Sequence, residues 1–281
     1  GNVRGGYNPN AKEVWQEALR IPPVKVYEKG KLKKDVWDLI FANIRLDIVA
    51  HDMRAQMGAC KVGERRLRSV IEKYGMDSYL AHKAALFEAS RKMVEAEIGQ
   101  IPNGVYSGEG MVYFDGHHVG TEFTIRVEIT VSDNKISFDY SKTDAQTDGF
   151  VNGTFTSSAS ATILTFLQMV NPDIPHNEGM VKPIEMIIPE GTILNASYPK
   201  ATTFGNHLCP PNADAIIRAL APVIPDRVTA GWNNLLCSLT TGEDPENGEP
   251  YVDIGFMGLK GGSGAMKGTD GYDHIGMIDA S

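Results

Sequence analysis

The stretch Ile136–Phe155, ISFDYSKTDAQTDGFVNGTF, organises the chain, because a strand pattern stops within it and a polar loop begins. Ahead of this stretch, apolar side chains at alternate positions from 123 to 131 have the period of a strand with one buried face. Asp133-Asn134 supplies a turn, and the alternation resumes from Ile136 to Tyr140. The sequence therefore predicts an antiparallel hairpin whose second strand ends at Ser141.

A polar loop follows the hairpin. Gly149 and Gly153 permit backbone geometry that a side chain would forbid. Polar loops at strand ends are common places for binding and catalytic sites. An ordinary solvated turn explains the same composition, so both interpretations stay open. The hydroxyl, amide and carboxylate groups of the loop belong to Thr143, Asp144, Gln146, Thr147, Asp148, Asn152 and Thr154.

Size and charge limit the class of protein. A chain of 281 residues with 42% hydrophobic content can bury a substantial core, in one large domain or two of ordinary size. The net charge of −8 gives no general attraction for nucleic acid or for an anionic membrane. Residues 1–100 carry 18 Lys plus Arg against 13 Asp plus Glu, and the remainder carries 9 against 22. This difference in charge between the two parts of the chain could favour contact between them, or binding of a partner subunit or of an anionic substrate. Solvated helix faces explain it equally well.

Cysteine usage and the ends of the chain suggest a compartment. The chain has an odd number of cysteines without CxxC spacing, which favours a reducing compartment over a disulfide framework. They are Cys60, Cys209 and Cys237. No apolar run approaches membrane-spanning length, and the N-terminus has no signal-peptide pattern. We therefore expect a cytoplasmic protein. The chain has no initiator Met, and we expect it to be a fragment of a longer polypeptide.

Helical periodicity dominates the first third of the chain. Apolar side chains at three- and four-residue spacings predict helices over 34–60, 62–74 and 79–98. Gly75 is suited to the C-cap position of the second of these helices. A shorter helix is expected over 11–19. We therefore expect a helical region over residues 1–104.

Strands and helices mix in the remainder, residues 105–281. The fold class predicted is α+β, a helical N-terminal third followed by a mixed β-sheet region with helices, packed as one unit. Asn212 is expected to be the N-cap of its helix. Besides the hairpin, the mixed region is expected to contain strands over 105–114, 181–188, 229–239 and 251–256 and helices over 157–170 and 212–220.

A glycine-rich segment near the end of the chain is one candidate site. Backbone N–H groups at Gly261, Gly262 and Gly264 could surround an oxyanion or a phosphate. The spacing matches neither the P-loop nor the dinucleotide-binding pattern. Close packing of backbone against backbone, or an interface with another chain, is the simpler explanation.

A polar patch on the second predicted helix is another candidate. Asp52 and Gln56 share one face of a helix, and Arg54 lies near them. Surface salt bridges are the simpler explanation for such a cluster.

Three histidines complete the candidates. His117 and His118 are adjacent, so on an extended backbone they point to opposite faces and are poorly placed to chelate one ion. His207 is a weak nucleophile or metal candidate, because no base or orienting acid can be located from the sequence. Buried histidines with satisfied hydrogen bonds are the simpler expectation for all three.

Several blocks of sequence resemble the hydantoinase B/5-oxoprolinase superfamily, in the same order and over nearly the whole chain. They include EALRIPPVKVYEKGKL (17–32), DMRAQ (52–56), FDYSKTDAQTDGFVN (138–152), NEGMVKPIEMIIPEGTILN (177–195) and LKGGSGA (259–265). Within that superfamily, HDMRAQMGAC (51–60), TFGNHLCPPNADAI (203–216) and GYDHIGMIDAS (271–281) look most similar to the alpha subunits of acetone carboxylases.

The resemblance implies an ATP-dependent ligase that joins a small ketone to a bicarbonate-derived carboxyl group and gives acetoacetate. It also implies a hetero-oligomer with a nucleotide-binding beta subunit and a small gamma subunit. ATP and manganese or magnesium would act in the full complex. The metal ligands of the family, histidines and an aspartate, would precede Gly1, so this chain alone is expected to bind no metal or other cofactor and to be inactive. ATP-dependent hydrolysis of a cyclic amide, such as hydantoin or 5-oxoproline, and a non-catalytic scaffold module are the alternatives.

Stabilising an enolate and a bicarbonate-derived anion needs cations and positioned hydrogen-bond donors. The resemblance suggests which residues of this chain line the substrate-binding chamber. His207 is expected to carry protons, Arg54 to hold an anion, and Gln146, with Asn152, to be an orienting hydrogen-bond donor. The expected substrate-binding residues are Gln56, Asn152, Asn206, Gly261, Gly262 and Gly264, and no metal ligand is expected.

Overall fold

The computed structural model describes residues 8, 10–45, 47–231, 238–255 and 262–273. The chain divides into two compact units. The first contains Ala18–Leu86, and the second contains Asn2–Glu17 together with Phe87–Ser281. The boundary therefore falls inside a long helix, whereas the sequence pattern suggested a division after residue 104.

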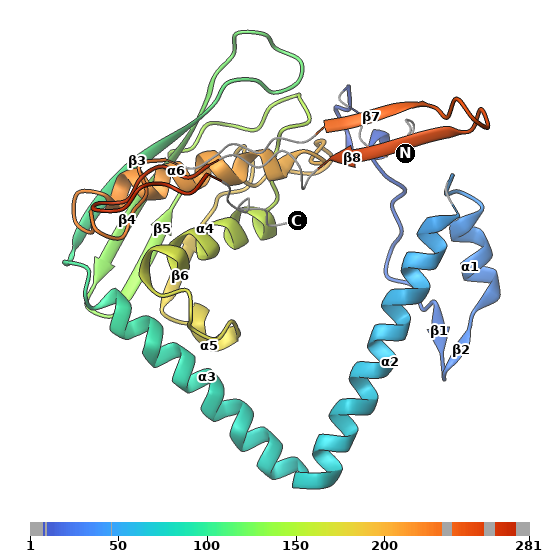
Figure 1. The fold of residues 1–281 in the computed structure, drawn as a ribbon, viewed down its shortest axis with the longest axis horizontal. Helices are drawn as coiled ribbons and strands as arrows, with labels where there is room; N and C mark the ends of the chain where they lie inside the picture. Colours follow the sequence, from blue (N-terminus) through green and yellow to red (C-terminus); the bar gives the residue numbers. More distant parts are fainter. Residues whose placement is uncertain (1–7, 9, 46, 232–237, 256–261, 274–281) are drawn as a thin grey trace. The chain divides into compact units, whose positions relative to one another are not determined.

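The first unit is mainly helical (Figure 1). Strands β1 (Tyr27–Glu28) and β2 (Lys31–Leu32) form a short antiparallel pair across a turn at Lys29-Gly30, where both residues have positive φ. Helix α1 spans Lys34–Phe41 and helix α2 spans Ile48–Tyr74.

The predicted break near residue 61 is wrong, because α2 continues through it and the chain instead leaves the helix after Phe41. No proline or capping residue interrupts the stretch between Cys60 and Val62, so nothing there stops a helix. Gly75 ends α2 as predicted, with φ of 83° and its N–H donating to the carbonyl of Ile71 at 2.8 Å. Helix α3, Met76–Ile98, follows at once.

The helix predicted over 11–19 is also wrong. Only a single 3-10 turn forms, η1 at Val14–Gln16. The N–H of Val14 donates to the carbonyl of Pro199 at 2.9 Å, and the N–H of Ala201 donates to the carbonyl of Lys12 at 3.2 Å. These bonds to a distant loop take backbone groups that a longer helix would need for itself.

A four-stranded sheet in the order β3-β4-β5-β6 forms the centre of the second unit. Strands β3 (Gly104–Val112), β4 (Phe123–Ser132) and β5 (Lys135–Asp139) are antiparallel neighbours. The predicted hairpin is confirmed, with Asp133 in the turn at φ of 53°. Strand β6 (Ile184–Ile187) pairs in parallel with β5 at the edge of the sheet, where the sequence predicts a longer edge strand.

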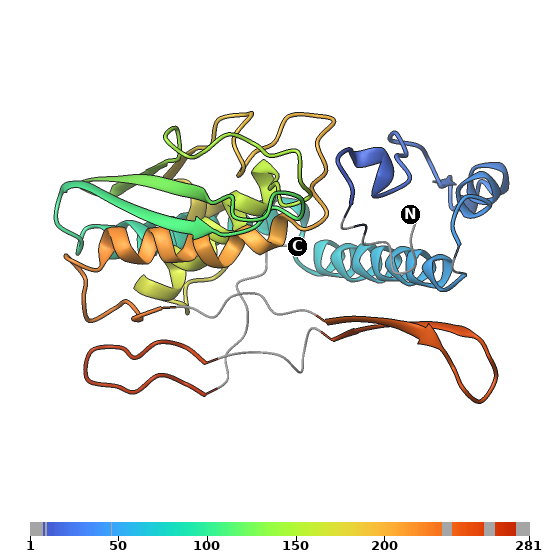
Figure 2. The same cartoon turned by 90° about the horizontal axis from the view of Figure 1, so that it is seen from above.

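One face of this sheet is covered by helix α6, Cys209–Leu220, which runs along β3 and β4 in both views (Figure 1 and Figure 2). Gly108 and Gly110 permit this close approach. A Cβ on Gly108 would lie 2.0 Å from the carbonyl oxygen of Ala215, and a Cβ on Gly110 would lie 1.8 Å from that of Pro211. Both distances are far below van der Waals contact, so only glycine fits there.

Helix α4, Phe155–Val170, packs beside α6 and completes the core. Its N-cap is Thr154, whose hydroxyl accepts from the N–H of Ser157. The ring of Phe166 meets that of Phe138 edge to face, with centroids 5.8 Å apart. The polar loop after β5 therefore ends in the cap of a buried helix.

Asn212 is not an N-cap, contrary to the sequence prediction. Helix α6 begins three residues earlier, at Cys209, directly after the 3-10 turn η2 (Gly205–Leu208). Proline has no N–H to lose in a first turn, so Pro210 and Pro211 start the helix rather than precede it. The side chain of Asn212 is fully buried and donates to the hydroxyl of Thr162 at 3.2 Å.

The remaining elements are the short helix α5 (Glu178–Val181) and the antiparallel strands β7 (Ser238–Glu243) and β8 (Pro250–Gly255). Most of the strand predicted over 229–239 lies outside the described residues. Within the described ranges, no helix is both long and apolar enough to cross a membrane. The fold is α+β, with a helical first third and a mixed sheet with helices after it, as the sequence predicts.

Candidate functional site

The polar loop after β5 is largely buried, so it is not an ordinary solvated turn. Thr143, Thr147 and Asn152 are all less than a tenth exposed. The carboxylate of Asp144 accepts from the N–H of Thr124 at 2.8 Å and binds the guanidinium of Arg126 at 2.5 Å. These contacts fix the start of the loop against β4.

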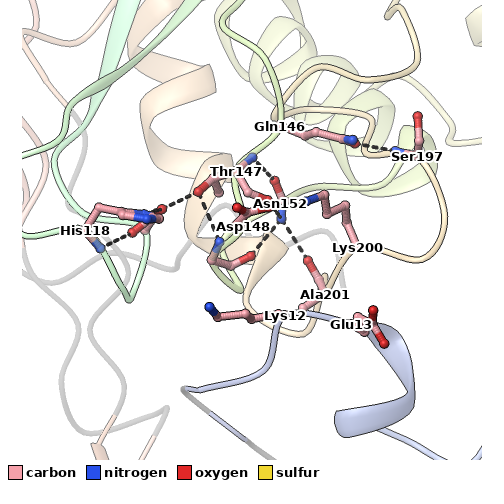
Figure 3. A network of polar contacts seen from close by, with 12 residues as sticks. Lys12, Glu13, His118, Gln146, Thr147, Asp148, Asn152, Ser197, Lys200 and Ala201 are labelled. Carbon is pink, nitrogen blue, oxygen red and sulfur yellow. Dashed lines mark hydrogen bonds and ion pairs between the residues drawn. The ribbon is translucent and has the colours of Figure 1, made fainter.

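Asn152 holds the centre of the loop together (Figure 3). Its side-chain oxygen Oδ1 accepts from the N–H of Thr147 at 2.9 Å. Its amide nitrogen donates to the carbonyls of Thr147, Gly149 and Ala201 at 3.2, 2.9 and 3.0 Å. The side chain has no exposed surface, and these bonds all go to backbone. Asn152 therefore joins the 147–152 loop to the segment that carries Ala201.

Asp115 joins the same loop to the β3–β4 connection. Its Oδ1 accepts from the N–H groups of His117 and His118 at 2.9 and 2.8 Å, which closes a tight turn. Its Oδ2 lies 2.7 Å from Nδ1 of His118 and also accepts from the hydroxyl of Thr147. The carboxylate is fully buried.

Burial raises the pKa of Asp115, but hydrogen bonds act in the opposite direction and outweigh it. The Thr147 hydroxyl, the His118 side chain and the two backbone N–H groups all favour the charged carboxylate, so the pKa lies well below its ordinary value. An ionised, fully bonded carboxylate thus connects two loops that are distant in the sequence.

We expect Asp115→Asn to weaken the protein at neutral pH and to make its stability less sensitive to acid. A carboxylate with a lowered pKa contributes stability above its unfolded-state pKa, near 3.8, and this contribution is lost as the pH falls below that value. The difference in unfolding free energy between wild type and variant should therefore shrink between pH 5 and pH 3. Urea unfolding at several pH values measures it, with the exposed Asp173→Asn as control. Parallel curves for wild type and Asp115→Asn would contradict the assignment.

A pocket of about 180 Å³ opens beside these two loops. Its lining side chains are aliphatic and aromatic with one imidazole, and polar atoms make up more than half of its exposed wall. A pocket of this kind can hold a small molecule that carries both polar and apolar groups. The lining residues are Met111, Val112, Tyr113, Phe114, Val151, His207 and Pro211.

An aromatic row connects His207 to the buried loop. The ring of His207 meets that of Phe204 edge to face at 5.1 Å, and Phe204 meets Phe150 at 4.6 Å. A Cβ on Gly116 would lie 1.8 Å from the ring of Phe150, so the turn made by Asp115 packs directly on this row. The position of His207 therefore depends on both loops.

Two further residues singled out from the sequence, Gln146 and Asn206, lie near the same loops. Gln146 accepts the N–H of Ser197 at 2.7 Å through its side-chain oxygen. The side-chain oxygen of Asn206 is buried and has no hydrogen-bond partner among the described residues. A Cβ on Gly205 would lie 2.6 Å from the carbonyl oxygen of Asn152, so the backbone next to Asn206 packs against Asn152. Asn152 thus packs against the segment that carries Asn206 and His207, whereas the side chain of Gln146 contacts Ser197.

Arg54 and Gln56 belong to the first unit, on α2, and both are exposed. The guanidinium of Arg54 lies over the ring of Trp37, 4.9 Å from its centroid. The structure therefore gives Arg54 a contact within its own unit.

Of the three glycines, Gly261 lies outside the described residues. A Cβ on Gly262 would lie 2.7 Å from the carbonyl oxygen of Tyr272, and one on Gly264 would lie 2.4 Å from the nitrogen of Gly231. The N–H of Gly264 donates to the carbonyl of Gly231 at 2.9 Å. These two glycines pack backbone against backbone, which uses the Gly264 N–H group for an internal bond.

One residue beside the candidate site that the sequence interpretation missed is Asp115. An aspartate followed by a glycine is a known turn signal, because the carboxylate can accept from the backbone N–H groups two and three residues further along. This signal could have identified the contact between Asp115 and His118. Among the residues that the structure describes, no group of three or more His, Cys, Asp or Glu could hold a metal ion.

Comparisons with known proteins place these features in a family. Residues 1–280 match the family model described as Hydantoinase B/oxoprolinase. The chain is 33% identical over 286 residues to the beta subunit of the caprolactamase of Pseudomonas jessenii, covering 99% of this chain and 48% of that protein. It is 32% identical to one subunit of a putative D-/L-hydantoinase of Pseudomonas sp. (strain NS671), covering 97% and 47%. The chain thus spans about half the length of these curated relatives.

Solved structures share the fold. The crystal structure of the ATP-dependent caprolactamase from Pseudomonas jessenii superposes with a TM-score of 0.90 at 31% identity, over 99% of this chain and 48% of that one. A nucleotide-free acetone carboxylase structure has a TM-score of 0.84 at 20% identity, over 96% and 38%. At that identity the second likeness establishes the fold alone.

Proposed function

The chain belongs to the Hydantoinase B/oxoprolinase family, and on that basis we propose that it is part of an ATP-dependent enzyme that opens cyclic amides. The observation that carries this proposal is the near-full-length similarity to the caprolactamase, in sequence and in structure. Both curated relatives are named as subunits, so a companion subunit is part of the proposal. The glycine-rich segment of this sequence does not match a known nucleotide-binding loop, and we assign the ATP site to that companion.

The pocket beside Asp115 is the proposed place for the ring of the substrate. Its apolar side chains can contact the methylene groups of a lactam, and its imidazole can donate a proton to, or accept one from, a polar group of the ring. ATP, when bound in the assembly, would supply the phosphoryl group that activates the amide. The residues of this chain then have three tasks, which are to bind the ring, to exclude water and to hold a proton at His207.

In this proposal three amide side chains mainly hold neighbouring groups in position. They belong to Gln146, Asn152 and Asn206. The amide of Asn152 is fully used by backbone groups, so it holds the wall of the pocket and does not reach the substrate. Asn206 precedes His207 in the η2 turn and helps to set its orientation. Four further residues are kept as proposed substrate contacts on the resemblance alone. They are Arg54, Gln56, Gly262 and Gly264.

Carboxylation of a ketone with bicarbonate, with ATP and manganese or magnesium in a hetero-oligomer, is the second candidate. The segments 51–60, 203–216 and 271–281, which resemble acetone carboxylase alpha subunits, favour it. His207 would then carry a proton to or from the enolate. Both candidates use the same pocket, because each substrate is small and has one carbonyl group.

ADP release by the purified full-length assembly distinguishes the two reactions. We expect stimulation by a lactam, hydantoin or 5-oxoproline, and no stimulation by acetone with bicarbonate. The opposite result would replace the first proposal by the second.

His207→Asn removes the proton carrier but keeps a polar side chain, so we expect it to lower turnover about a hundredfold. His176→Asn, at an exposed position, should leave turnover unchanged. Equal turnover in wild type and His207→Asn would remove the pocket from the mechanism.

A further inference from the structure

The segment of residues 10–17, here called the N-terminal strap, lies along the loop of residues 197–203. The N–H of Val14 donates to the carbonyl of Pro199, and Glu13 forms a β-bridge with Lys200. The ring of Trp15 meets that of Tyr198 edge to face at 5.2 Å. The strap belongs to the second unit, and the chain passes into the first unit directly after Glu17.

Glu17 makes the strongest contact of the strap. Its Oε2 accepts from the N–H of Thr202 and its Oε1 accepts from the N–H of Thr203, both at 2.8 Å. The residue is only 6% exposed. Hydrogen bonds from backbone N–H groups to a carboxylate are short and about twice as strong as neutral ones. A buried carboxylate that holds two successive N–H groups fixes the direction of the backbone between them.

The backbone that Glu17 holds leads directly to His207. The N–H of Gly205 donates to the carbonyl of Thr202 at 2.9 Å, and the N–H of His207 donates to the carbonyl of Phe204 at 3.0 Å. These two turns lead into η2. The direction of the backbone at Thr202 and Thr203 therefore determines where the imidazole of His207 lies. The side chain of Asn152 donates to the neighbouring carbonyl of Ala201 at 3.0 Å.

We propose that Glu17 is a positioning residue for His207, and that the N-terminal strap is thereby a functional part of the pocket. This inference rests on the proposed function only for the role of the pocket. The placement of the imidazole by Glu17 is a separate physical claim. Small displacements of a reacting group can reduce turnover by orders of magnitude, so the contact matters to chemistry as well as to stability.

Glu17→Gln tests the proposal in the full-length assembly. The amide can accept one N–H group, but its NH₂ then faces the other, so the bidentate contact is lost while size is kept. We expect kcat to fall about tenfold or more, with an unchanged KM for ATP and an unfolding temperature within a few degrees of wild type. Glu190→Gln, at an exposed position of the same unit, is the control and should change neither kcat nor the unfolding temperature.

A second measurement is independent of the reaction. Hydrogen–deuterium exchange at the imidazole carbon, followed by mass spectrometry, reports the surroundings of each histidine in the same assembly. In Glu17→Gln we expect the exchange rate and titration midpoint of His207 to shift, and those of the exposed His176 to stay. A shift at His207 without lactam-dependent turnover would keep this inference and reject the proposed substrate. An unchanged His207, or a loss of activity only in proportion to unfolded protein, would overturn the inference.

Discussion

Replacement of Asn152 by alanine is expected to abolish turnover by the full assembly and to lower the free energy of unfolding by about 3 kcal/mol or more. The physical reason is the number of groups left unpaired. The carbonyls of Gly149 and Ala201 and the N–H of Thr147 would lose their partner in a site without solvent. Each unsatisfied buried group costs about 1–3 kcal/mol.

Two controls separate this effect from the general cost of removing an amide. Asn195→Ala removes a single bond, to the carbonyl of Ile188, and should cost about 1 kcal/mol. Asn152→Asp keeps the size and the acceptor but places a carboxylate oxygen against carbonyl oxygens, so it should destabilise the protein as strongly as alanine does. Urea unfolding measures all three variants. A cost for Asn152→Ala no larger than that for Asn195→Ala would show that the loop has another support.

Gly149→Ala is the second change for which we expect a large effect. A Cβ at this position would lie 2.0 Å from the carbonyl oxygen of Asp115, so the loop or the turn must move. Because the clash is with backbone, a side-chain rotation cannot relieve it. We expect a loss of about 3 kcal/mol in stability and of most activity, since the two walls of the pocket would separate.

The matched control for this variant is Gly58→Ala in α2, where a Cβ meets nothing within 4 Å. In a helix interior alanine is about 1 kcal/mol more favourable than glycine, so this change should stabilise the protein. Thermal unfolding and turnover of both variants provide the comparison. Gly149→Ala with wild-type activity would mean that the contact between Asp115 and the loop does not shape the pocket.

Local sequence signals predicted the regular elements well. The alternation from 123 to 140 and the turn at Asp133 indicated the hairpin, and Gly75 indicated the end of α2, because these features depend only on neighbouring residues. The errors occurred where distant groups intervene. The strap forms one 3-10 turn because its backbone bonds to Pro199, and Asn212 lies inside a helix that two prolines begin.

The candidate site was predicted in part. The polar loop, Asn152, Asn206 and His207 could be selected from the sequence, but the burial of the loop and the use of the Asn152 amide could not. Asp115 and Glu17 escaped notice, since a single carboxylate in a sequence has no period or spacing to reveal its partner. The partners of Glu17 lie 185 and 186 residues further along the chain.

The order of amino acids was enough to establish the α+β class, the central hairpin and the family, because periodicity and ordered blocks of residues are properties of the chain alone. Which polar residues act together became visible only in the folded molecule. Backbone N–H and carbonyl groups are identical at every position, so no sequence pattern shows which of them a buried carboxylate or amide will bind. The folded chain brings Asp115 against the 147–152 loop, and it brings Asn152 and Glu17 against the loop of residues 197–203 that leads to His207.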